Sequence, residues 1–416
     1  MSKRFNILWL LILLVVMTAC GNNELEEINN EGYSQYQTGD FDAAITTLTE
    51  GIAIDEDYPD FYTNRGMAYY ETGDNAAALE DLNKSLSLQT TNPEAYVNRG
   101  TVYLGLGEYE KALADFYEAI EQQGSFEQPL GLYYTYLNLG TLLNQVGEYS
   151  EALTVFNKAL EEYDEDPALF NSIGLLYRAT GDYDLGIEAF NQALEINQDY
   201  AYAYGNRGSI FYLLEDYSIA LSDVNTALTL DRYVPQFYDL KAKIQYKQED
   251  YLALEETVKE GLNIWVSYSE LYMDLGNAYM KQERYTDALM QFGLAIQYEY
   301  YDAYLSQAIA YRMIDDYEGA LEVLDKYLAN NPNHVQGMME QGISLQGIDD
   351  NVAAIEVFES VINIAPETHD ARYYMALSYE YLNDYEKAKD LLKEVIEHDP
   401  EHKNALKELA FLEEHY

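Results

Sequence analysis

Apolar residues along the chain recur at helical spacing, in short runs separated by polar breaks. One run includes Leu275 and Tyr279, the next includes Leu289 and Phe292, and residues 282–284 form the break between them. Apolar positions three or four residues apart lie on one face of an α-helix. The pattern therefore predicts a hairpin of two helices joined by a tight turn.

This hairpin pattern repeats with a period of 34 residues. A small residue marks the same point of each period: Gly32, Gly66, Gly100, Gly140, Gly174, Gly208, Ala242, Gly276, Ala308, Gly342 and Ala376. Two steps differ, with 40 residues from Gly100 to Gly140 and 32 from Gly276 to Ala308. A period of this length is typical of a solenoid, in which each unit buries its apolar face only by stacking on its neighbours.

The period resembles the tetratricopeptide repeat, and the resemblance covers residues 25–416. In the unit that begins at Pro93, signature residues occupy positions 4, 8, 11, 15, 17, 20, 24 and 27: Tyr96, Gly100, Tyr103, Gly107, Tyr109, Ala112, Phe116 and Ala119. This register gives eleven repeats, which start at Leu25, Pro59, Pro93, Tyr133, Pro167, Ala201, Pro235, Ser269, Tyr301, Val335 and His369. The resemblance implies an all-α solenoid wound as a right-handed superhelix, with residues 403–416 as a capping helix.

Some repeats depart from the family pattern. Gly186 and Leu254 replace the alanine of position 20, and Asn75 and Asn351 replace the aromatic residue of position 17. Repeats one to three span residues 25–126 and repeats four to eleven span residues 133–402, so residues 127–132 form an insertion between them. We expect the insertion to make a longer loop or a helix extension.

The N-terminus has the features of an export signal. Lys3 and Arg4 precede an apolar run that is too short for a membrane span and that ends at Cys20, which is the only cysteine of the chain. Residues 1–19 resemble a bacterial lipoprotein signal, which implies cleavage before Cys20, lipid attachment to its sulfur and a short tether over residues 20–24. The chain would then be held in the cell envelope, at the outer membrane in a diderm bacterium. The alternatives are an ordinary signal peptide or an uncleaved anchor.

The net charge limits the choice of partners. Without Lys3 and Arg4, 22 basic residues face 73 acidic ones, which gives a net charge of −51. Such a chain repels nucleic acid, so no nucleic-acid partner is expected. A solvated acidic exterior is the simplest explanation of the charge.

The family's concave face consists mainly of positions 2, 5, 9, 12 and 13 of each first helix. On repeats four to nine these positions carry tyrosines, methionines and cations and few acids. The candidate groove residues are Arg178, Tyr202, Tyr212, Lys243, Tyr246, Lys247, Met280, Lys281 and Arg312. Exposed aromatic and cationic side chains on a concave wall are typical of a partner site.

A structural interpretation of these groove residues stays open. Chance alone would place about three of the cations at such positions, against the five found. Lys243 lies one helical turn after Asp239, so the two could form a surface ion pair. Tyrosine occurs 43 times in the chain, mostly at positions that pack the core.

Catalytic and metal-binding motifs are missing from the sequence. There is no nucleophile elbow, phosphate-binding glycine loop or zinc-binding helix. His398 and His402 flank Pro400, which breaks the helix that would align them on a metal. Position 5 is never lysine, so the family's carboxylate clamp is not carried over. We expect no enzyme activity, no cofactor and no metal.

Two functions remain. The first is a lipid-anchored scaffold that binds partner proteins or peptides in its groove. The alternative is an accessory protein that binds an exported polysaccharide or peptidoglycan, with tyrosines such as Tyr202, Tyr212 and Tyr246 stacked on sugar rings. Loss of tyrosines should impair a saccharide site, whereas a protein site should be sensitive to salt.

Overall fold

The computed structural model describes residues 24–126 and 129–416. The predicted signal sequence, Cys20 and residues 127–128 of the insertion lie outside this part. The described residues form helices and turns without any strand, so the prediction of an all-α fold is confirmed. The chain divides into two compact units, unit 1 (Met1–Ile210) and unit 2 (Phe211–Tyr416), and the boundary falls within α11 (Ala201–Leu213).

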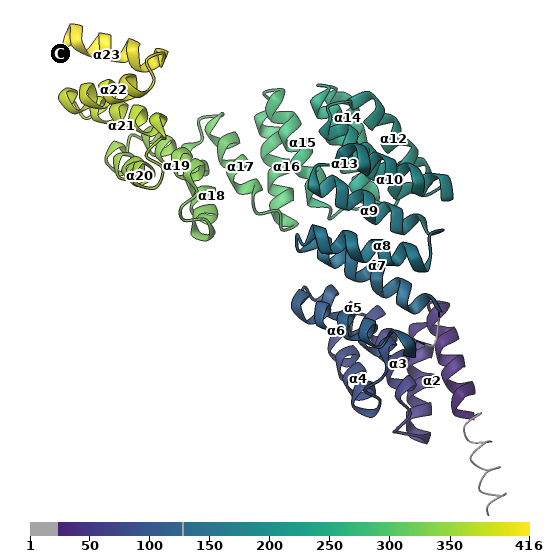
Figure 1. Cartoon of the computed structure of the whole chain (residues 1–416). Helices are drawn as coiled ribbons and strands as arrows, with labels where there is room; N and C mark the ends of the chain where they lie inside the picture. The colour runs from purple at the N-terminus through teal and green to yellow at the C-terminus, as the bar shows by residue number, and fades with distance from the viewer. Residues whose placement is uncertain (1–23, 127–128) are drawn as a thin grey trace, which may run out of the picture. The chain divides into compact units, whose positions relative to one another are not determined.

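Unit 1 is a row of helical hairpins (Figure 1). The first helices of its repeats are residues 24–37, α3 (Pro59–Glu71), α5 (Pro93–Gly105), α7 (Pro129–Gln145), α9 (Pro167–Thr180) and the start of α11. The second helices are α2 (Phe41–Ile54), α4 (Asn75–Leu88), α6 (Tyr109–Glu121), α8 (Tyr149–Glu162) and α10 (Tyr183–Ile196). A short 3-10 helix, η1 (Gln123–Ser125), follows α6.

Unit 2 has the same construction. The first helices of its repeats are α13 (Pro235–Lys247), α15 (Ser269–Lys281), α17 (Ala303–Arg312), α19 (Val335–Gly347) and α21 (His369–Tyr381). The second helices are α12 (Tyr217–Leu230), α14 (Tyr251–Ile264), α16 (Tyr285–Gln297), α18 (Tyr317–Asn330), α20 (Asn351–Ile364) and α22 (Tyr385–His398), and α23 (Lys403–His415) covers the last of them. Every substantial contact in either unit joins helices that are at most two apart in order.

Local chemistry sets where these helices begin and how the hairpins turn. Pro93 and Pro167 stand at the first helical position, where their missing N–H is not needed. Asp74 caps α4 by accepting a hydrogen bond from the N–H of Ala77. At position 15 of each repeat the backbone takes a left-handed turn, with glycine in unit 1 (Gly73, φ +85°) and an acid or amide in unit 2 (Glu283, φ +59°).

The core of each hairpin depends on the small residue at position 8. In repeat ten, a Cβ on Gly342 would lie 2.4 Å from the ring of Phe358, which is fully buried on the partner helix. The absence of a side chain therefore lets α19 and α20 approach until the ring covers the backbone. The same contact recurs between Gly140 and Phe156, where the distance would be 2.5 Å.

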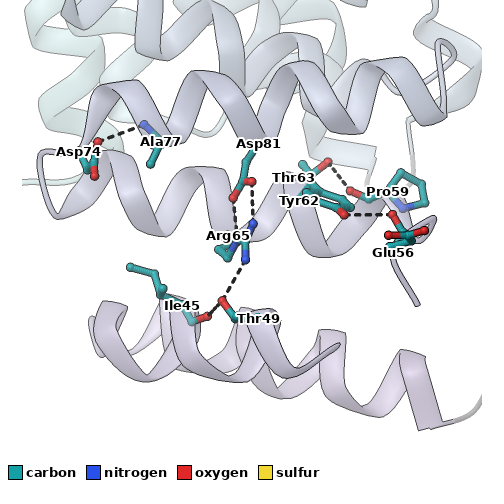
Figure 2. A network of polar contacts seen from close by, with 10 residues as sticks. All are labelled: Ile45, Thr49, Glu56, Pro59, Tyr62, Thr63, Arg65, Asp74, Ala77 and Asp81. Atoms are coloured by element: carbon teal, nitrogen blue, oxygen red, sulfur yellow. Dashed lines mark hydrogen bonds and ion pairs between the residues drawn. The ribbon is translucent and has the colours of Figure 1, made fainter. Parts of the chain in front are cut away.

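In repeat two and again in repeat three, an arginine–aspartate pair joins the first helix of the repeat to its second helix. Arg65 Nε donates to Asp81 Oδ2 at 2.7 Å and Nη2 donates to Oδ1 at 2.8 Å, while Nη1 reaches Thr49 Oγ1 of the preceding repeat at 2.9 Å (Figure 2). Arg99 forms the same two bonds with Asp115. Arg65 thus joins α3 to α4 and also contacts α2, and Arg99 joins α5 to α6.

The two irregular steps in the period appear as changes of helix length. Helix α7 is 17 residues long and begins at Pro129, so the last residues of the insertion form its additional first turn. Helix α17 is only 10 residues long and begins at Ala303. Within the described ranges, no helix is both long and apolar enough to cross a membrane.

Candidate functional site

Unit 1 contains an apolar cavity of about 700 Å³ on the face formed by its first helices. We call it the unit 1 cavity. Its walls come from residues 24–37, α3, α5 and the start of α7: Tyr33, Tyr36, Gln37, Thr63, Asn64, Met67, Glu94, Val97, Asn98, Phe126, Leu130, Gly131 and Tyr134. In the register given above eight of these thirteen residues are at the concave positions 2, 5, 9, 12 and 13, and Asn64 and Asn98 are at position 6. The cavity therefore lies on the concave face that the register predicts.

Phe126, just after η1, and the first turn of α7 form one end of the unit 1 cavity. Phe126 and Leu130 both line it, and Leu130 is 43% exposed although it is a large apolar residue. A Cβ on Gly131 would lie 2.5 Å from the ring of Phe126, so only glycine lets this ring rest against the first turn of α7. The extra helical turn in α7 thus supplies an apolar wall that a standard repeat would not have.

A second, smaller cavity of about 240 Å³ adjoins the first. It shares Tyr33, Thr63, Asn64 and Glu94 with the unit 1 cavity. Its other walls are polar except for Pro93: Asn29, Asn30, Asp60, Gln89, Thr91, Asn92, Pro93 and Ser125. No lysine, arginine or histidine lines either cavity. The combined site therefore has an apolar compartment and a neutral-to-acidic polar compartment.

Hydrogen bonds between and within repeats hold these walls in place. Asn64 Nδ2 donates to Asn29 Oδ1 at 2.9 Å, which joins α3 to the first helix. Thr63 Oγ1 and Ser85 Oγ lie 2.8 Å apart in the buried interior behind the polar compartment. Burial, followed by the charge of Glu71, raises the pKa of Tyr36 above its ordinary value, so this phenol stays protonated. The cavity is therefore largely pre-formed, as small binding sites usually are.

The predicted groove residues of unit 1 lie further along the same row of helices. Arg178 on α9 is half-buried, and its Nη1 donates to Ser209 Oγ at 2.9 Å. Burial lowers the pKa of Arg178. Tyr202 is 47% exposed, and its ring lies 6.0 Å from that of Tyr200.

In unit 2 the structure pairs two of the predicted cations with acids. Lys243 Nζ lies 2.7 Å from Asp239 Oδ1, so the ion pair that the sequence left open is present. Arg312 Nε donates to Glu340 Oε2 at 2.7 Å. Lys247 and Lys281 are exposed at the ends of α13 and α15. The positive charge of this stretch is thus partly neutralised by Asp239, at the concave position 5 of repeat seven, and by Glu340, at position 6 of repeat ten.

The remaining predicted residues of unit 2 lie beside its core. Tyr246 and Met280 are partly buried and pack against the buried cluster around Tyr272 and Phe292. Tyr212 lies 5.9 Å from Tyr217, measured between ring centres. The packing of Tyr246 and Met280 on the core is consistent with the structural interpretation of these two side chains.

Lys243 also stands beside a second carboxyl group. Burial lowers the pKa of Lys243, but its hydrogen bond to Asp239 and the charges of Asp239 and Asp274 more than offset this, so the pKa is raised. Burial, then the charge of Asp239, raises the pKa of Asp274 well above its ordinary value. Asp274 Oδ2 is buried without a hydrogen-bond partner. This part of the groove is therefore a carboxyl pair with one lysine.

No cluster of three or more histidine, cysteine, aspartate or glutamate side chains with the geometry of a metal site occurs among the residues that the structure covers. His398 stacks on His369 with 5.0 Å between ring centres, and His402 caps α23 by accepting the N–H of Ala405. Both histidines that the sequence raised as possible ligands therefore have structural contacts.

Sequence reasoning did not identify the unit 1 cavity. The signal was present in two features: the insertion at residues 127–132, and the apolar or aromatic residues Tyr33, Tyr36 and Met67 at positions 9 and 12 of the first two repeats. The sequence alone could not show that Phe126 and Leu130 line the same cavity as Tyr33, Tyr36 and Met67.

Comparison with known families identifies the repeat. Models described as TPR repeat match residues 32–73, 66–107 and 174–215, and models described as tetratricopeptide repeat match residues 91–165, 273–335 and 370–402. Together these matches cover more than half of the chain. No curated protein is similar enough in sequence to be matched.

Solved structures resemble the fold. A tetratricopeptide repeat protein from Parabacteroides merdae is 22% identical and has a TM-score of 0.51, with 61% of this chain and 98% of that one covered. Yeast Tom70 is 16% identical with a TM-score of 0.41 and covers 93% of this chain and 99% of its own. A chain of the APC/C hetero-tetramer Cut9–Hcn1 is 12% identical and has a TM-score of 0.47, with 85% of this chain and 96% of that one covered. At these identities the likeness concerns the fold alone.

Proposed function

Because the chain belongs to the tetratricopeptide repeat family, we propose that it is a non-catalytic scaffold that binds a partner protein on the concave face of unit 1. The partner inserts an apolar side chain into the unit 1 cavity. The observation that carries this proposal is the cavity itself, which has about 700 Å³ of space and aromatic and aliphatic walls. An apolar concavity with a few placed polar groups is the usual form of a binding site.

The wall chemistry favours a protein partner over a saccharide. Met67, Val97 and Leu130 present aliphatic surface, which gains by excluding water from an apolar side chain but offers nothing to sugar hydroxyls. Asn64 and Asn98 stand at the edge of the same cavity, where their amides can pair with the main chain of an extended segment. Together these groups fit a peptide segment with a large apolar residue.

The proposal places the scaffold at the bacterial cell envelope, held by a lipid on Cys20. The support is sequence-based: a basic start, a short apolar run and the only cysteine of the chain at the end of that run. The test is incorporation of a labelled fatty acid in growing cells. We expect label and membrane association in the natural chain and loss of both in Cys20→Ser. Label in the Cys20→Ser variant, or none in either chain, would disprove lipid attachment at this residue.

Partner binding is tested with one change in the cavity wall. Met67→Arg places a charge in the unit 1 cavity, and Met67 belongs to none of the buried core clusters, so the fold should survive. The matched control is Leu185→Arg, which adds the same charge at a 45% exposed apolar position on α10. We expect the full chain and the control to retain the same envelope protein in an affinity capture and the Met67→Arg variant to lose it. Equal retention by all three would show that the cavity is not the binding site.

A further inference from the structure

Arg178 stands apart from the arginines that the structure ties to acids. Arg65 and Arg99 each form two bonds with an aspartate, and Arg312 contacts Glu340 at 2.7 Å. Across the described ranges, no carboxylate lies within ion-pair distance of Arg178, although acids outnumber basic residues by 73 to 24 in this chain. Its one hydrogen bond to a side chain is the 2.9 Å contact with Ser209 Oγ.

The environment of Arg178 disfavours its charge without supplying a counter-ion. Burial is the main influence on this guanidinium and lowers its pKa, whereas the hydrogen bonds with Asp115 are the main influence on Arg99 and raise its pKa. A half-buried cation loses water contacts, and that cost is recovered only when an anion or several acceptors replace the water. A guanidinium has five N–H donors in one plane, and Ser209 takes only one of them.

Ser209 also fixes the direction of the guanidinium. Its own hydroxyl donates to the carbonyl oxygen of Asn206 at 2.6 Å, so its lone pairs face Arg178. The concave positions of repeats four to six around it include Thr141, Leu175 and Tyr202 but no acid. The groove positions nearest to Arg178 in the register therefore offer no competing carboxylate.

The strongly acidic chain does not prevent an anion from binding there. Charges separated by more than the Debye length, about 8 Å at physiological ionic strength, are largely screened. A carboxylate in contact with Arg178 would form two parallel charge-assisted bonds, which are the strongest of the ordinary hydrogen bonds. At contact distance the local pair therefore outweighs the distant acids.

We propose that Arg178 binds a carboxylate of the partner segment, either an aspartate or glutamate side chain or a chain terminus, with Ser209 as a positioning residue. This inference rests on the proposed function, because it places the carboxylate on the segment that fills the unit 1 cavity. Neighbouring first helices lie about 10 Å apart. The cavity is lined by repeats one to four and α9 belongs to repeat five, so an extended segment crosses the intervening helices in roughly three to twelve residues.

The first experiment uses a displayed library of random 16-residue linear peptides, selected on the full chain in detergent and in parallel on Arg178→Gln. With the natural chain we expect peptides that combine a large apolar residue with an acid within about twelve residues of it. With Arg178→Gln we expect the apolar residue to persist and the acid to disappear. An equal frequency of acids in both selections would overturn the role of Arg178 and leave the scaffold intact. Failure to select any peptide would count against the proposed function itself.

The second experiment measures the affinity of one selected peptide by fluorescence anisotropy. Arg178→Gln should weaken binding on the order of tenfold, the size expected for a lost hydrogen bond to a charged group. Replacing the peptide's acid by its amide should weaken binding equally in the natural chain and have no further effect in the variant. Arg178→Lys keeps the charge but not the paired N–H donors, so its affinity for the peptide should lie between those of the natural chain and of Arg178→Gln.

Lys158→Gln is the matched control for the loss of one positive charge. Lys158 is exposed on α8, where it faces the ring of Tyr136 from 5.7 Å, and its removal should leave the affinity unchanged. If Lys158→Gln weakened binding as much as Arg178→Gln, the effect would be one of overall charge and the site would be refuted. The same conclusion would follow if the two changes, in Arg178 and in the peptide acid, weakened binding additively.

Discussion

Replacing Arg65 by methionine tests the energetic role of the arginine–aspartate pair in repeat two. Methionine keeps most of the side-chain volume but removes all three hydrogen bonds and leaves Asp81, whose side chain is 7% exposed, without a counter-charge. Removing one member of a buried ion pair costs about 3–5 kcal/mol. We therefore expect the opening of α3 and α4 to become easier by about 3 kcal/mol at pH 7.

Protonation of Asp81 sets a ceiling on this cost. At pH 7 an ordinary carboxylate can be neutralised for about 4 kcal/mol, because each pH unit is worth about 1.4 kcal/mol. Burial already raises the pKa of Asp81, and loss of Arg65 must raise it further. In the variant the folded state therefore keeps a proton that the unfolded chain releases, so the destabilisation grows as pH rises and shrinks as pH falls toward 5.

Amide hydrogen exchange, followed on peptides from α3 and α4, is the suitable assay. Repeat solenoids open in parts, so one midpoint for the whole chain does not report on one repeat. The double variant Arg65→Met/Asp81→Leu should regain most of the lost protection, because replacing both members of a buried pair by apolar residues is often nearly neutral. Thr49→Val is the control for the bond to the preceding repeat.

A loss below 1 kcal/mol that did not change with pH would refute this reasoning. It would show that Asp81 rotates into water when Arg65 is gone, and that the burial seen in the structure depends on the arginine. A double variant no more stable than Arg65→Met would equally contradict the electrostatic account, since it would assign the whole effect to packing.

Three further predictions concern unit 2. Glu283→Gly should strengthen the protection of α15 and α16 in hydrogen exchange by the equivalent of up to about 1 kcal/mol, because Glu283 has φ +59° and glycine adopts that conformation without strain; weaker protection would contradict this. Gly342→Ala should destabilise α19 and α20 by about 1–3 kcal/mol, as its Cβ would lie 2.4 Å from the ring of Phe358, and unchanged hydrogen exchange there would refute the close contact. The pKa of Asp274 is raised well above its ordinary value, first by burial and then by Asp239, so the free energy of unfolding should fall as pH rises from about 4 through that pKa. Asp274→Asn should remove this slope in the opening free energy of α15, measured by hydrogen exchange across pH and corrected for the intrinsic exchange rate, and an unchanged slope would assign it to other groups.

The fold could be predicted because each of its determinants is local. Pro93 and Pro167 mark helix starts whatever lies around them, and Gly342 records a close helix contact within its own hairpin. Repetition then multiplies a weak signal. A departure such as Asn75 at an aromatic position leaves the hairpin intact, since α3 and α4 still pack through the other positions.

The site could be predicted only in outline, because it depends on contacts between repeats. The register assigned Arg312 and Lys243 to the concave face, but it could not tell that Glu340, 28 residues from Arg312, would reach that arginine. The unit 1 cavity depends on how Phe126 turns against Gly131, which follows from the packing of an inserted segment. Spacing in the sequence carries no such information.

The restriction of contacts to helices at most two apart gives each unit a distinctive response to force. When the two ends of a unit are pulled, the load passes through one hairpin after another, because among the described residues no substantial contact joins helices more than two apart. A repeat of 34 residues that gives way would lengthen the chain by roughly 100 Å. A scaffold fixed at its N-terminus and bound to a partner would therefore unfold one repeat at a time under load. Its folded repeats would stay bound while the distance between the attachment points increased.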